Sequence, residues 1–126
     1  MGAKRPRPVV LDAGALIAVD RADRRVIRLL ELAEAVHVPA GALAQAWRNP
    51  ARQVRLTRVL ASEGIVVHPL DAATARAVGQ LCAATGTSDI VDASIVLVAR
   101  IVDGVAVTSD SDDLRRLDPR IDFIEC

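Results

Sequence analysis

Short apolar runs alternate with amphipathic segments along nearly the whole chain, and this alternation constrains the fold more than any other feature. Each run is only a few residues long and is rich in Val and Ile, which is typical of buried β-strands. The strands predicted in this way are residues 8–11, 36–39, 65–70, 105–108 and 121–125. Strands that alternate with helices form a parallel sheet with helices on both faces. The sequence therefore predicts a three-layer α/β/α fold around a central, mostly parallel five-stranded sheet.

The segments between these runs carry the signals of helices. They place Asp, Ser or Thr ahead of apolar residues at helical spacing, and Gly or Pro near their ends. The predicted helices are residues 13–18, 26–33 with Asp20 or Asp23 as cap, 41–47, 51–61, 72–84, 90–102 with Ser88 or Asp89 as cap, and 110–117. Asn49 and Pro50 separate the third helix from the fourth, because a residue before proline avoids the helical region.

Length, charge and cysteine content narrow the class of protein. The 126 residues suit one compact domain, which we place at residues 8–126 after a basic N-terminal tail at residues 1–7. The formal net charge is zero, so binding to nucleic acid would depend on a local basic patch. Cys82 and Cys126 form neither a zinc motif nor a disulfide framework. No signal peptide is indicated, and no apolar stretch reaches the roughly 20 residues that span a bilayer. These features favour a cytoplasmic protein that does not bind membranes.

Aspartates follow two predicted strands and begin one apolar helix. Asp12 follows the first strand and Asp110 follows the fourth, and ligand sites in open parallel sheets form at the carboxyl ends of strands. Asp89 and Asp92 lie less than one turn apart at the start of the helix at 90–102, so both can face the same way. Carboxylates that are brought together repel one another unless they are protonated or bind a cation. A hard divalent cation such as Mg²⁺ or Mn²⁺ prefers oxygen ligands of this kind.

Each of these acids also has a purely structural interpretation. Asp12, Asp89 and Asp110 stand where a helix begins and can serve as N-caps. Asp112 and Asp113 lie in the first turn of the helix at 110–117, where the helix dipole favours negative charge. The sequence leaves both interpretations open.

Four segments, taken in order, resemble the PIN-domain family. The first is Val9-Val10-Leu11-Asp12 followed by residues 13–17, and the second is residues 38–40 leading into residues 43–48. The third is Ser88-Asp89-Ile90-Val91-Asp92-Ala93-Ser94-Ile95-Val96 and the fourth is Val107-Thr108-Ser109-Asp110-Ser111-Asp112-Asp113-Leu114. Together they extend over almost the whole chain after Pro8.

This resemblance implies a PIN-like fold and a Mg²⁺- or Mn²⁺-dependent ribonuclease. It also implies similarity to VapC-type toxins, which a cognate antitoxin holds in check and which usually dimerise. The family's catalytic, metal-binding acids correspond to Asp12, Asp92 and Asp110, with Asp89 and Asp112 as further candidate ligands. The expected partners are therefore an RNA substrate, a cognate antitoxin protein and a second copy of the chain.

Gln45 departs from the family pattern. The family's second acid is typically a glutamate on the helix after the second strand, and Gln45 stands at that position here. An amide can still offer an oxygen, but the metal site loses a negative charge. Either Asp89 replaces that charge, or the chain is a catalytically degenerate PIN domain that acts as a protein- or RNA-binding module.

Four further residues are expected around the carboxylates. Arg48 and Gln45 are candidates for substrate binding, because Arg48 follows Gln45 by almost one helical turn. Thr108 and Ser109 are expected to orient Asp110 through hydroxyl hydrogen bonds.

Other phosphoryl-chemistry folds fit the sequence less well. Phosphoreceiver and haloacid-dehalogenase-like domains also place an aspartate after the first strand, but typically need a lysine later in the chain. Lys4 is the only lysine and precedes the first strand. A P-loop ATPase is excluded because the GxxxxGK[ST] motif is absent.

Overall fold

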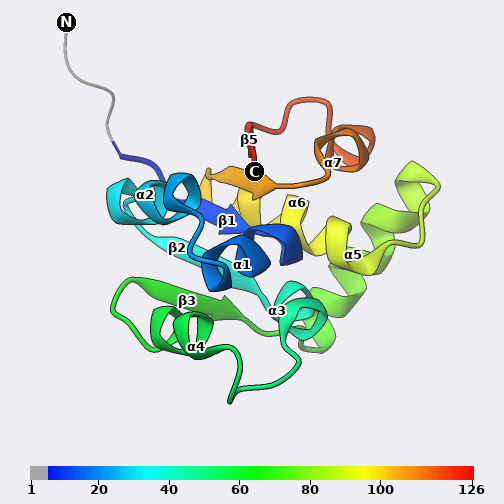
Figure 1. The fold of residues 1–126 in the computed structure, drawn as a ribbon. Helices are drawn as coiled ribbons and strands as arrows, with labels where there is room; N and C mark the ends of the chain where they lie inside the picture. The colour runs from blue at the N-terminus through cyan, green and yellow to red at the C-terminus, as the bar shows by residue number, and fades with distance from the viewer. Residues whose placement is uncertain (1–5) are drawn as a thin grey trace, which may run out of the picture.

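The computed structural model describes residues 6–126, so most of the basic tail predicted at residues 1–7 lies outside the described residues. The described part contains five strands and seven helices (Figure 1). The strands are β1 (Val9–Leu11), β2 (Val36–Pro39), β3 (Ile65–His68), β4 (Val105–Thr108) and β5 (Phe123–Glu125). The helices are α1 (Ala13–Asp20), α2 (Arg24–Leu32), α3 (Ala40–Ala46), α4 (Val54–Leu60), α5 (Ala72–Thr85), α6 (Ile90–Val102) and α7 (Ser111–Leu117). The elements follow the predicted order.

All five strands belong to one sheet with the order β3-β2-β1-β4-β5. Every neighbouring pair is parallel, which confirms the predicted five-stranded sheet and makes it parallel throughout. The chain builds β1, β2 and β3 outward in one direction and then returns to place β4 beside β1. The strand order therefore reverses between β1 and β4, which is where open α/β sheets bind ligands.

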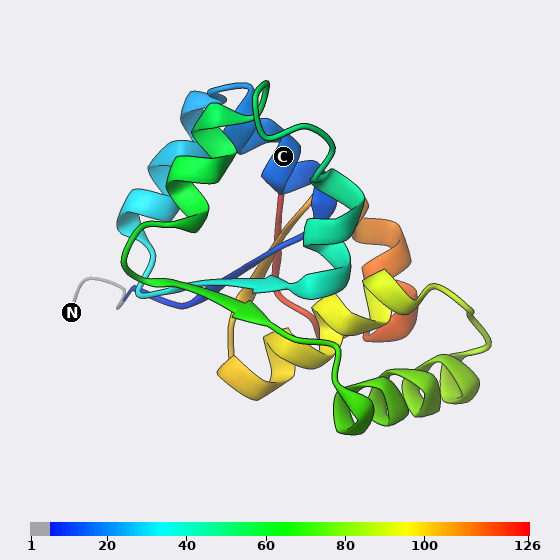
Figure 2. The same ribbon diagram turned by 90° about the horizontal axis from the view of Figure 1, so that it is seen from below.

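Helices cover both faces of the sheet, as the predicted three-layer arrangement requires (Figure 2). Helices α1, α2 and α4 lie on one face, and α5 and α6 lie on the other. The centre of α6 is buried because the helix packs against β1, β2 and β4. No single helix within residues 6–126 is long and apolar enough to cross a membrane. The helices α5 and α6 pass that test only as a pair, and they are bent by 107°.

The largest difference from the predicted boundaries is at α4, which begins at Val54 and not at residue 51. The Gln53 side chain explains this late start. Its Oε1 accepts hydrogen bonds from the backbone amides of Arg48 (2.8 Å) and Asn49 (3.0 Å), and its Nε2 donates to the carbonyl of Ala46 (2.8 Å). Gln53 thus holds the segment around Pro50 as a turn.

Aspartate side chains cap four helices in the described residues, at Asp12, Asp23, Asp71 and Asp89. Each carboxylate accepts a backbone amide of the first turn, which otherwise lacks a partner. The structure selects Asp23 for α2, while Asp20 accepts the amide of Leu56 at 3.3 Å. It selects Asp89 for α6. Two of the candidate site acids, Asp12 and Asp89, therefore have a capping role as well.

Candidate metal centre

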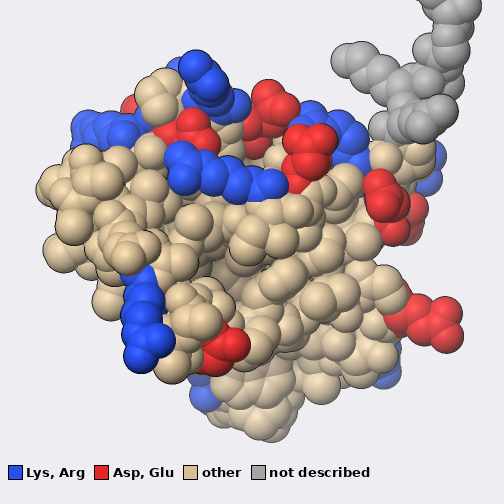
Figure 3. Space-filling model, turned by 180° about the vertical axis from the view of Figure 1, so that it is seen from behind, with Lys and Arg blue, Asp and Glu red and all other residues tan. Residues whose placement is uncertain are grey.

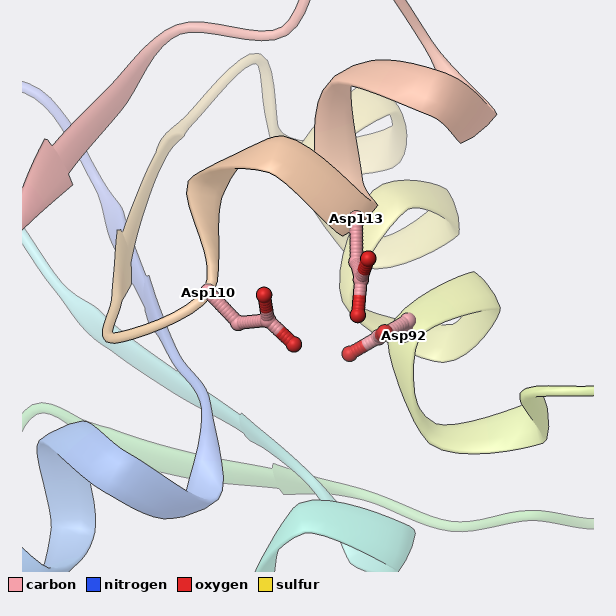
Figure 4. A group of neighbouring side chains, drawn as sticks. All are labelled: Asp92, Asp110 and Asp113. Atoms are coloured by element: carbon pink, nitrogen blue, oxygen red, sulfur yellow. The ribbon is translucent and has the colours of Figure 1, made fainter.

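Three carboxylates converge beside the point where the strand order reverses (Figure 4). Asp110 follows β4, Asp92 lies in the first turn of α6, and Asp113 lies in the first turn of α7. One oxygen from each carboxylate lies within 4.8 Å of the others. The donor set consists of carboxylate oxygens alone, which suits a hard divalent cation. The residues present therefore fit a metal site.

Asp12 supports this group from the end of β1, where its side chain is only 7% exposed. Its Oδ1 accepts the amide of Ala15 at 2.7 Å. Its Oδ2 accepts the Thr108 hydroxyl at 2.6 Å and the Ser109 amide at 3.0 Å. The Asp12 carboxylate thereby joins the start of α1 to the loop after β4.

Thr108 links Asp12 to Asp110 through hydrogen bonds. Its hydroxyl donates to Asp12 and accepts the backbone amide of Asp110 at 2.8 Å. Ser109 contributes its backbone amide, which donates to Asp12. Gly14 packs against the Ser109 side chain so closely that a Cβ there would collide with it. The loop that carries Asp110 is thus held by hydrogen bonds and by close packing.

Burial and neighbouring carboxylates raise the pKa values of Asp92 and Asp110. Burial, followed by the charge of Asp89 and a hydrogen bond with it, raises the pKa of Asp92 from 3.8 to about 7. The pKa of Asp110 is also raised, first by a hydrogen bond with Asp113 and then by burial and neighbouring charge, including that of Asp12. Without a cation, Asp92 therefore retains its proton in part of the molecules near neutral pH, and a bound cation would displace it.

Asp89 lies beside the three carboxylates. Its Oδ1 accepts the backbone amide of Asp92 at 3.0 Å. Asp89, Asp92 and Asp113 line a pocket of about 340 Å³, together with the segment after α5 and the end of α7. Substrate could therefore approach the carboxylates from this side.

The family of this chain follows from comparison with known proteins. The family model of the PIN domain matches residues 9–119. This chain belongs to the PIN-domain family. PIN domains are generally nucleases, and they usually use divalent metals. Among curated proteins, no sequence matches the chain.

Solved structures share the PIN fold over most of the chain. The FitAB complex bound to an IR36 DNA fragment has a TM-score of 0.63 and 17% identity, over 93% of this chain and 94% of that chain. VapBC2 from Rickettsia felis, bound to a DNA fragment from its promoter, has a TM-score of 0.67 and 16% identity, over 94% of this chain and 98% of that chain. FitAcB from Neisseria gonorrhoeae has a TM-score of 0.59 and 18% identity, over 92% of this chain and 96% of that chain. At these identities the likeness concerns the fold.

The structure brings Asp113 to Asp92 and Asp110 and directs Asp112 elsewhere. Asp112 is exposed and forms an ion pair with Arg115 at 2.8 Å. The sequence predicts Asp113 mainly as a first-turn acid favoured by the helix dipole, with contact to a metal as the alternative, and it ranks Asp112 ahead of Asp113 as a candidate ligand. A signal was present, because Asp110 and Asp113 are three residues apart and Leu114 and Leu117 follow at helical spacing. Those buried leucines set the rotation of α7 and turn Asp113 toward α6.

Gln45 and Arg48 lie at the C-terminal end of α3. Gly41 of α3 faces the Val91 side chain of α6, and Gln45 follows one turn later on the same face as an exposed residue. Arg48 donates from Nη1 to the carbonyls of Ala44 (3.0 Å) and Trp47 (2.7 Å). In this structure Arg48 therefore caps the end of α3.

Proposed function

We propose that this PIN domain is a metal-dependent endoribonuclease and the toxin component of a toxin–antitoxin pair. The observation that carries the proposal is the convergence of Asp92, Asp110 and Asp113 where the strand order reverses. Membership of a family of nucleases supports hydrolysis of a phosphodiester. The similar structures FitAB and VapBC2 are toxin–antitoxin complexes, which supports the biological role.

In this proposal Asp92, Asp110 and Asp113 hold Mg²⁺ or Mn²⁺, and Asp12 adds negative charge from the end of β1. A bound ion of this kind lowers the pKa of a water molecule and stabilises charge on phosphoryl oxygens. Asp92 loses its proton when it becomes a ligand, since its pKa is close to neutrality in the free protein. Asp89 supplies the additional charge that Gln45 does not.

The remaining site residues position the ligands. Asp12 and Thr108 form a hydrogen-bonded chain that ends at the backbone amide of Asp110. This chain holds the loop after β4 in place, so that Asp110 needs little rearrangement to bind an ion. Arg48 and Gln45 remain proposed contacts for the RNA. For Arg48 such contact requires the side chain to leave the carbonyls at the end of α3.

Calorimetric titration with Mn²⁺ tests the metal site. We expect Asp92→Asn to weaken binding at least tenfold, because it removes one of three carboxylate ligands. Asp112→Asn is the matched control, since it deletes an equal charge from an exposed residue that pairs with Arg115, and we expect its affinity within twofold of the wild type. Equal binding by Asp92→Asn and the wild type would refute the assignment.

An RNA cleavage assay then tests the reaction. Single-stranded RNA should be cut by the wild-type protein in Mn²⁺, and the cleavage should stop when the metal is chelated. Asp92→Asn should be inactive, while Asp112→Asn should retain activity. Cleavage that continues in the chelator would exclude the metal-dependent mechanism.

A binding module without catalytic activity is the second candidate, and Gln45 is the observation that favours it. The variant Gln45→Glu restores the acid that the family typically has at this position. A gain in Mn²⁺ affinity and in RNA cleavage would show a weakened enzyme. RNA binding without cleavage, at saturating Mn²⁺ in both proteins, would favour the module.

The proposed partners are a cognate antitoxin and a second copy of the chain. The face to which α5 and α6 contribute carries few charged side chains (Figure 3). Large apolar residues are also exposed, among them Ile101 at 76% and Val66 at 44%. Exposed apolar surface is typical of protein interfaces. Sedimentation velocity at micromolar concentration should show a dimer, and a monomer throughout would contradict this part of the proposal.

A further inference from the structure

Arg116 forms an ion pair with one of the three carboxylates. Its Nη1 lies 3.3 Å from Oδ1 of Asp113. Among the ion pairs of residues 6–126, this is the one that includes a member of the Asp92, Asp110 and Asp113 group. The Arg116 side chain is 80% exposed, so it can move without disturbing the core.

The neighbouring Arg115 has the same charge but a different environment. It pairs with Asp112 at 2.8 Å, and its guanidinium lies over the Phe123 ring at 5.0 Å from the centroid. Arg115 is therefore directed toward β5, whereas Arg116 lines the pocket that contains Asp89 and Asp92. The two arginines form a matched pair on one helix.

Asp113 cannot serve Arg116 and a divalent cation equally well. The ion pair engages one oxygen of the Asp113 carboxylate, and the guanidinium charge would repel an incoming cation. The pocket volume of about 340 Å³ falls within the range of ligand-binding pockets. If the Arg116 guanidinium left Asp113, it would lie at the wall of this pocket. The guanidinium donors form a planar fork, which matches the geometry of a phosphate.

We propose that Arg116 is an internal counter-ion that competes with the metal for Asp113 and binds an RNA phosphate once the metal has taken its place. In the metal-free protein, Arg116 offsets part of the carboxylate repulsion. In the loaded protein, it lines the pocket beside the carboxylates and contacts the phosphate backbone there. The inference rests on the proposed metal-dependent ribonuclease function.

Metal titration without RNA tests the first half. We expect Arg116→Gln to bind Mn²⁺ about two- to fivefold more tightly than the wild type, as loss of an exposed competing ion pair implies. Arg115→Gln removes the same charge from the same helix, and we expect its affinity within twofold of the wild type. Thermal melts of both variants confirm that they are folded, which the exposure of both side chains favours.

RNA binding and cleavage at saturating Mn²⁺ test the second half. For Arg116→Gln we expect KM for a single-stranded RNA oligonucleotide to rise several-fold with little change in kcat. We also expect the slope of log affinity against log salt to fall by about 0.7, the value for one lost phosphate contact. Arg115→Gln should leave both quantities near their wild-type values.

The outcomes separate this inference from the function on which it rests. Tighter Mn²⁺ binding and weaker RNA binding in Arg116→Gln alone would support it. If the wild type binds Mn²⁺ and the two arginine variants behave alike, the inference is wrong and the metal site stands. Weaker Mn²⁺ binding in Arg116→Gln would also overturn it. If the folded wild type binds no Mn²⁺, the proposed metal site fails and the role of Arg116 fails with it.

Discussion

Replacing Asp92 with asparagine should stabilise the metal-free protein while it weakens metal binding. The ionised Asp92 carboxylate lies against Asp89, Asp110 and Asp113, and burial adds to the unfavourable energy of its charge. Asparagine resembles the protonated carboxyl in shape and can donate a hydrogen bond to Asp89. The substitution therefore relieves repulsion without creating a cavity.

The magnitude follows from the pKa of Asp92, which rises from 3.8 to about 7. The full effect of such a change on folding would be roughly 4 kcal/mol. Asp92 is partly exposed, so solvent screens the repulsion, and its position in the first turn of α6 favours a negative charge. We therefore expect a gain of about 1–2 kcal/mol at pH 8, or about 4–8 °C in Tm for a domain of this size.

The stabilisation should depend on pH with a definite sign. A carboxyl pKa that is higher in the folded than in the unfolded state lowers stability as pH rises between the two values, here from about 4 to 7. The advantage of Asp92→Asn should therefore be full at pH 8, fall to roughly a third at pH 5, and disappear below pH 4. Differential scanning fluorimetry at these pH values, in chelator, measures it.

Addition of Mn²⁺ should remove most or all of the advantage of Asp92→Asn. At an ion concentration of 100 Kd the wild type gains about 2.7 kcal/mol, whereas a variant that binds tenfold more weakly gains about 1.4 kcal/mol, and the difference is similar to the expected advantage. Asp112→Asn is the control, because its exposed carboxylate pairs with Arg115, and its Tm should stay within about 2 °C of the wild type. A Tm for Asp92→Asn that is equal to or below the wild-type value at pH 8 without metal would refute the reasoning.

Three other variants test further parts of the structure. Asp12→Asn should lower the free energy of unfolding by about 1–3 kcal/mol in urea titrations. An asparagine amide cannot accept every hydrogen bond that the Asp12 carboxylate accepts, among them the one from the Ser109 amide. An unchanged urea midpoint would contradict this. Gln45→Glu should tighten Mn²⁺ binding about five- to tenfold through added negative charge, and an unchanged Kd would place residue 45 too far from the ion. Burial and the charge of His68 lower the pKa of His37, so this histidine contributes a loss of stability as pH falls below about 6.5, which opposes the gain from Asp92 over the same range. His37→Gln should remove that loss, and equal Tm changes between pH 7.5 and 5.5 in both proteins would exclude it.

The pattern of apolar runs and helical segments was enough to predict the strands, their parallel arrangement and the sheet edge at which the acids gather. These follow from local patterns, because apolar runs specify strands and helical crossovers make them parallel. Asp12 and Asp110 could be placed at that edge because Asp12 directly follows one strand and Asp110 lies two residues past the end of another. Turn chemistry was harder to predict, since the late start of α4 depends on hydrogen bonds from the Gln53 side chain to both sides of Pro50.

Which acids meet, and what charge they carry, depends on how the helices pack against one another. Asp113 reaches Asp92 because α7 packs against α6, and the burial of Leu114 and Leu117 sets the rotation of that short helix. No local pattern encodes the distance between residues so far apart in the chain. The pKa of Asp92 and the ion pair of Arg116 have the same origin, because both depend on neighbours that other elements or the rotation of α7 bring close. Proximity in space, and not order in sequence, determines how carboxylates repel one another and where a cation can bind.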